Sequence, residues 1–68
     1  MRYKRNQMAM SKGEAFRMAR SMFKETRRNS YVVYDISGRE YQAWNEMSPV
    51  CQNEIDEGYV QLIAIVKK

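Results

Sequence analysis

The hydrophobic pattern predicts one long helix early in the chain. Ser11 and Glu14 have the spacing of a capping box, in which the Ser11 hydroxyl accepts from the third helical amide and Glu14 reaches back to the Ser11 amide. No helix-breaking residue follows before Arg28. The apolar side chains in between fill an arc of about 160°, which is typical of a stripe that faces a core. They are Ala15, Phe16, Met18, Ala19, Met22 and Phe23.

A β-hairpin is predicted next. Residues 31–36 are rich in β-branched and aromatic side chains, and residues 39–44 return as a second strand. Between them, Asp35-Ile36-Ser37-Gly38 has the Asp and Gly positions of a type I turn, which is typical of a three-residue hairpin loop with a left-handed glycine. This register sets Asp35 opposite Arg39. A two-residue turn would set Asp35 opposite Glu40, where like charges repel, so we predict the first register.

The predicted register decides which side chains share a face of the sheet. The core face carries Tyr31, Val33, Tyr41 and Ala43, and the other face carries Val32, Tyr34, Glu40, Gln42 and Trp44. Aromatic rings among polar side chains on an open sheet face can stack on nucleic-acid bases or anchor a protein partner. Tyr34 and Trp44 are therefore candidate contact residues. The alternative interpretation is that Trp44 belongs to the core at the end of its strand.

A short helix is predicted over residues 49–57. Ser48 is a favourable N-cap, proline is favoured at the first helical position, and Gly58 is a natural end. Val50 and Ile55 are expected to face inward, and Cys51 is expected to be buried or inert. The acidic residues at the end of this helix are expected to be solvated or to pair with the basic helix. They are Glu54, Asp56 and Glu57.

The third strand is predicted over residues 59–66. Val60, Leu62, Ala64 and Val66 are expected on one face, with Ile63 and Ile65 on the other. Because both faces are apolar, both need a cover. The first helix supplies one, and the short helix or a second copy of the chain supplies the other.

These elements predict an α+β fold, with an N-terminal amphipathic helix packed on a small, mostly antiparallel sheet of three strands. The order is helix, strand, strand, short helix, strand, and the third strand is placed beside the first in a sheet order of 2-1-3. Residues 10–68 are predicted to form a single domain, and residues 1–9 a flexible basic arm.

Length and composition exclude several classes of protein. A chain of 68 residues has room for one domain, but not for a second domain that closes over a substrate. It contains no histidine, the commonest general base and metal ligand, and its single cysteine cannot form an internal disulfide. We therefore expect no catalytic activity, no cofactor and no metal site. No apolar run is long enough for a membrane span or a secretory signal, so we expect a cytoplasmic protein without a membrane partner.

Charge is distributed unevenly. Residues 1–28 hold nine basic and two acidic residues, a net +7, whereas residues 29–68 have a net charge of −3. Five basic side chains fall within roughly 100° of the predicted helix, opposite its apolar stripe. They are Arg17, Arg20, Lys24, Arg27 and Arg28. Arg20, Lys24 and Arg28 stand four residues apart and repel one another, although cations in the last turn are also favoured by the helix dipole.

A basic face of this kind predicts a polyanionic partner, and nucleic-acid phosphates are the first choice. Arg2, Lys4 and Arg5 of the arm are expected to add contacts. The alternative is an inhibitor or adaptor, of the kind that phages and mobile elements encode, that docks on an acidic protein surface through the same face and the exposed aromatics. A solvated face, or a homodimer in which the basic helix meets Glu54 and Glu57 of the other copy, are the remaining interpretations.

Overall fold

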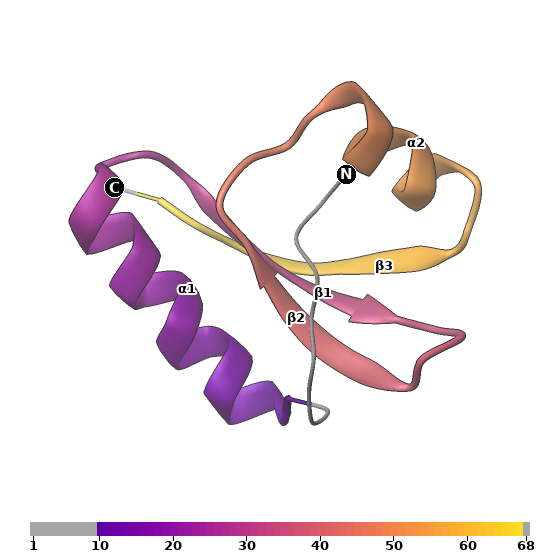
Figure 1. The fold of residues 1–68 in the computed structure, drawn as a ribbon, viewed down its shortest axis with the longest axis horizontal. Helices are drawn as coiled ribbons and strands as arrows, with labels where there is room; N and C mark the ends of the chain where they lie inside the picture. Colours follow the sequence, from indigo (N-terminus) through magenta and orange to yellow (C-terminus); the bar gives the residue numbers. More distant parts are fainter. Residues whose placement is uncertain (1–9, 68) are drawn as a thin grey trace.

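The computed structural model describes residues 10–67, so the arm predicted over residues 1–9 lies outside the described residues, as does Lys68. The elements follow the predicted order: α1 (Lys12–Thr26), β1 (Ser30–Asp35), β2 (Glu40–Trp44), α2 (Pro49–Asp56) and β3 (Val60–Val66). The strands form an antiparallel sheet in the order β2-β1-β3, and α1 and α2 lie on opposite sides of it (Figure 1). The α+β class and the 2-1-3 order are therefore confirmed.

The capping box of α1 is present as predicted. The Glu14 amide donates to Ser11 Oγ over 3.2 Å, and the Ser11 amide donates to Glu14 Oε1 over 2.9 Å. The helix ends earlier than predicted, because Arg27 takes a left-handed conformation with φ 61° and donates its amide to the Phe23 carbonyl. Thr26 Oγ1 then accepts from the Arg28 amide over 3.1 Å. Arg27 and Arg28 thus follow the helix rather than form its last turn.

The predicted hairpin register is wrong by one position. Asp35 lies opposite Glu40, the pairing that the sequence argument disfavoured, and the loop covers residues 36–39. The left-handed residue in the loop is Arg39, with φ 54°, and not Gly38. Two hydrogen bonds offset the repulsion between the carboxylates: the Gln42 side-chain amide donates to Asp35 Oδ2 over 3.4 Å and to Glu40 Oε2 over 3.3 Å.

This slip exchanges the two faces of β1 relative to those of β2, so the predicted grouping of Tyr31 and Val33 with Tyr41 and Ala43 on one face is wrong. Val32, Ala43 and Tyr41 lie on the side of α1, which we call the α1 face, where Ala15 and Ala19 pack against them with no exposed surface of their own. Val33 and Trp44 lie on the opposite side, the α2 face, and pack against the second helix. The core is therefore two apolar layers with the sheet between them. Small alanines at the contact let the backbone of α1 approach the sheet closely.

A β-bulge divides β3. Ala64 lies opposite Val32 and Leu62 lies opposite Val33, so Ile63 has no opposite residue in β1. An extra residue changes the face to which the following side chains point. Val60 therefore packs in the layer under α2, while Ala64 and Val66 pack in the layer under α1. The prediction that these residues share one face is wrong.

The second helix covers part of the α2 face. Ser48 caps it by accepting from the Cys51 amide over 3.2 Å, and Gly58 follows its end with φ 89°. Cys51 is buried and Ile55 packs beside it, as predicted. Val50 is 65% exposed, so its predicted inward position is wrong.

Candidate functional site

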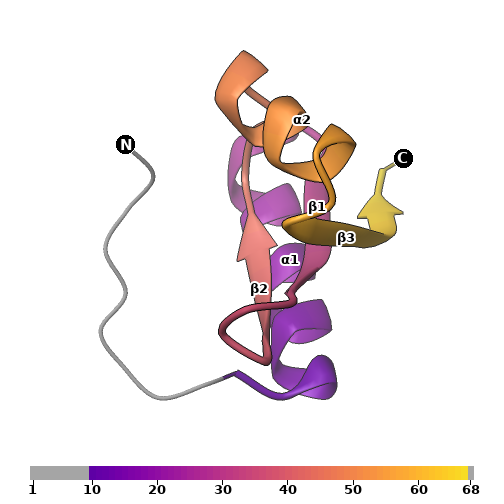
Figure 2. The same ribbon diagram turned by 90° about the vertical axis from the view of Figure 1, so that its right-hand side faces the viewer.

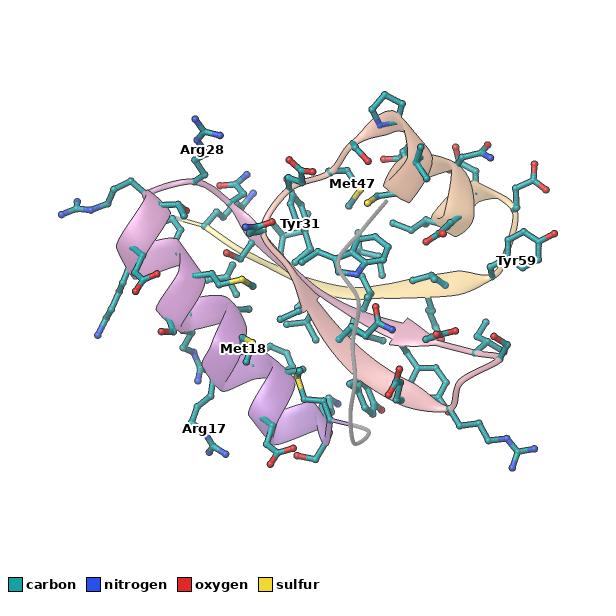
Figure 3. The ribbon with its side chains drawn as sticks, viewed as in Figure 1. Arg17, Met18, Arg28, Tyr31, Met47 and Tyr59 are labelled. Carbon is teal, nitrogen blue, oxygen red and sulfur yellow. The ribbon has the colours of Figure 1, made fainter. Side chains whose placement is uncertain are left out.

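The outward side of α1 presents a row of cations. Because Ala15 and Ala19 are fully buried against the sheet, the residues on the far side of the helix point to solvent. Arg17, Arg20 and Lys24 lie there and are exposed, and we call these three the basic face. At 1.5 Å rise per residue, the basic face extends about 10 Å along the helix. Figure 3 shows Arg17 pointing away from the sheet.

Carboxylates do not neutralise this face within the described part of the chain. Between residues 10 and 67, no ion pair joins Arg17, Arg20 or Lys24 to an acidic side chain. Glu14 is engaged in the capping box. The local partner of Arg20 is an aromatic ring, since its guanidinium carbon lies 5.7 Å from the centre of the Phe16 ring. A cation–π contact of this kind leaves the positive charge of Arg20 in place.

The two arginines that follow α1 form a second group of cations together with Lys67. Arg27 and Arg28 are exposed, and Figure 3 shows Arg28 pointing outward from the chain beyond α1. Ser30 lies opposite Val66 in the sheet, which brings Lys67 to the same end of the molecule as Arg28. We call Arg27, Arg28 and Lys67 the basic end. Only the pairing of β1 with β3 reveals this neighbourhood, because Lys67 is far from Arg28 in the sequence.

The candidate aromatic contacts do not form one surface. Trp44 is only 4% exposed, and its indole Nε1 donates to Gln42 Oε1 over 3.0 Å on the α2 face. Tyr34 lies half-buried on the α1 face, with its ring centre 4.9 Å from that of Tyr41. The expected exposure of Trp44 is therefore wrong, and its alternative interpretation as a core residue is confirmed. The remaining candidates, Arg2, Lys4 and Arg5, lie outside the described residues.

Acidic side chains gather at the end of the sheet that is remote from the basic end. Glu57 caps α2, and the backbone carbonyl of Glu54 accepts from the Tyr59 amide just before β3 begins. Figure 3 shows Tyr59 at this end, far from Arg28. We call Glu54, Asp56 and Glu57 the acidic end. Residues 10–67 contain no cluster of three or more side chains suited to hold a metal ion.

Comparisons of the chain with protein-family models, with curated proteins and with solved structures found no match. Within the part that the structure describes, neither helix has the length and apolar character needed to cross a membrane.

Proposed function

We propose that this protein is a small, non-enzymatic nucleic-acid-binding protein that contacts phosphates through α1. The observation that carries the proposal is the basic face, in which three exposed cations share one side of a helix and none forms an ion pair with a carboxylate among the described residues. A helix that needed only solubility would gain stability from interleaved acidic side chains. A row of side chains that all carry positive charge attracts the negatively charged phosphate backbone of a nucleic acid.

The contacts would be mainly electrostatic. Arginine and lysine bind phosphates, and asparagine or glutamine, which read adenine edges, is missing from the basic face. Arg27, Arg28 and Lys67 would extend the contact beyond the end of α1. We therefore expect weak sequence selectivity and strong salt dependence. The free Cys51 is consistent with action in the reducing cytoplasm.

Binding to an acidic protein surface is the weaker candidate. Aromatic anchors in the centre of an interface supply most of the affinity between proteins. Trp44, the side chain expected to act in this way, is in the core. The cations that remain would steer association without supplying such an anchor.

Charge reversal on the basic face tests the proposal. Lys24→Glu is expected to weaken binding of a short DNA duplex by about tenfold, because a charge-assisted contact is lost. Arg39→Glu is the matched control, since it makes the same change of charge in the exposed hairpin loop and is expected to weaken binding less than about threefold. Fluorescence anisotropy measures both. Equal losses in the two variants would mean that net charge, and not the basic face, governs binding.

A further inference from the structure

The outer edge of β3 differs from the opposite edge of the sheet. At the β2 edge, the Tyr41 amide donates to the carbonyl of Met10 over 3.2 Å, so another segment of the chain already occupies part of it. At the other edge, β3 pairs with β1 alone among the described strands, and Figure 2 shows no labelled element beyond it. Natural edge strands often carry a charge or a proline that hinders pairing. Val60–Val66 carries neither, although the bulge at Ile63 is another feature found in edge strands.

Apolar side chains also remain exposed along this strand. Leu62 lies opposite Val33 and Ile65 lies opposite Tyr31, which places both on the α2 face. The short α2 helix covers the start of β3, where Val60 is buried, but Leu62 stays 37% exposed and Ile65 43% exposed. An uncharged edge with exposed apolar side chains is suited to pair with another strand.

The charges at the two ends of β3 select the direction of that pairing. The strand starts at the acidic end and finishes at the basic end, with Lys67 directly after Val66. A second copy that pairs in parallel would bring like charges together. A copy that pairs in antiparallel fashion brings the basic end of each chain to the acidic end of the other, and this charge complementarity identifies the occupant as the protein itself.

We infer that two copies of this protein pair through antiparallel β3 strands about a two-fold axis, which joins their sheets into one. Side chains directly opposite each other in an antiparallel pair point to the same face. Opposite side chains share a face on both sides of the bulge when Leu62 lies opposite Ile65 of the second copy. The two-fold axis then places Ile65 of the first copy opposite Leu62 of the second. It also brings Lys67 to the end of the second copy where Glu57 lies. The basic face of α1 takes no part in this interface, which shares only the basic end with the proposed nucleic-acid contact.

Sedimentation equilibrium of nucleic-acid-free protein tests the inference. Between about 1 µM and about 1 mM the wild type is expected to pass from monomer to dimer. Ile65→Lys places an ammonium opposite Leu62 in both halves of the interface and is expected to raise the dimer Kd by at least about tenfold. Met18→Lys is the matched control, because Met18 is similarly exposed, at 46%, but lies on α1. It is expected to leave the Kd unchanged, and circular dichroism checks that both variants fold.

Two further measurements make the test specific for the antiparallel arrangement. Lys67→Glu and Glu57→Lys are each expected to raise the Kd several-fold, and the double variant to restore it, because the exchanged charges still attract across a two-fold axis. In the wild type, hydrogen exchange of β3 amides is expected to slow as protein concentration rises, while that of β2 amides stays constant. A wild type that stays monomeric throughout, equal effects of Ile65→Lys and Met18→Lys, or β3 amides that gain no protection would overturn the inference.

Discussion

Gln42 helps to stabilise the observed hairpin register. Its side-chain amide is almost fully buried and donates to the carboxylates of Asp35 and Glu40, while its carbonyl oxygen accepts from Trp44 Nε1. Two carboxylates opposite each other in a sheet repel, and a buried indole N–H without an acceptor is costly. The Gln42 side chain therefore donates to both carboxylates and accepts from the indole N–H. The Asp35 carboxylate also accepts from the Gly38 amide and the Ser37 hydroxyl, which fixes the loop.

Gln42→Leu is predicted to reduce the free energy of unfolding by about 1–3 kcal/mol, because it removes the acceptor of a buried donor and the bridge between two carboxylates. Urea denaturation measures the change. Gln52→Leu is the control, since the Gln52 side chain donates an exposed hydrogen bond to Asp56, and loss of that bond should change stability by less than about 0.5 kcal/mol. If the two variants unfold at the same urea concentration, the network around Gln42 does not stabilise the hairpin.

At the scale of elements, α1 depends on its first turn. The helix covers the α1 face, and Ser11 and Glu14 set its start through two reciprocal hydrogen bonds. A capping box satisfies backbone donors that would otherwise lack partners. Since the basic face lies on the same helix, loss of the cap should affect stability without changing the charge that meets a ligand.

Ser11→Ala is predicted to reduce the free energy of unfolding by about 1 kcal/mol through loss of the N-cap acceptor. Ser21→Ala is the control, because Ser21 is exposed in the middle of α1, where alanine has the better helix propensity. Thermal unfolding followed by circular dichroism is expected to show a lower Tm for Ser11→Ala and an unchanged or higher one for Ser21→Ala. Equal Tm values in the two variants would contradict a stabilising role of the capping box.

Local signals in the sequence predict the helices and strands. Packing between residues distant in the sequence determines the hairpin register and the bulge, which those signals do not predict. The caps at Ser11 and Ser48 depend on residues within one turn, so their positions were predicted correctly. The hairpin register depends on Gln42, whose buried amide offsets a repulsion that looked decisive between neighbours alone. The bulge at Ile63 depends on the fit of β3 to β1, which no local pattern encodes.

In the candidate site, too, the features set by local spacing are predicted and those set by long-range packing are not. Helical spacing placed Arg17, Arg20 and Lys24 on one exposed face, as the structure has them. The same spacing also predicts Arg27 and Arg28 on this helix, but the left-handed turn at Arg27 separates them from it. The burial of Trp44 agrees with its alternative interpretation as a core residue, and the neighbourhood of Arg28 and Lys67 follows from the pairing of β1 with β3.

Across residues 10–67, charge as well as apolar packing is distributed unevenly over the molecule. The helix α1 lies on one side of the sheet (Figure 1) and carries the basic face, and β3 runs from the acidic end to the basic end. These two features have separate consequences. The first concerns a polyanion that meets α1, and the second concerns a second copy that meets β3. Each can be removed by substitutions that leave the other in place.

The central claim, that α1 binds nucleic acid through phosphates, is tested most directly by the salt dependence of binding. Anisotropy titrations with labelled duplex DNA, single-stranded DNA and RNA would be carried out at about 50 and about 200 mM salt. If Arg17, Arg20, Lys24, Arg27 and Arg28 neutralise about five phosphates, log K should fall with log salt at a slope of about −4.5 on duplex DNA, a loss of about 500-fold over this range. Reversal of Arg17, Arg20 and Lys24 to Glu should abolish binding. No binding of any of the three nucleic acids at the lower salt concentration, or binding that does not respond to salt, would contradict the account.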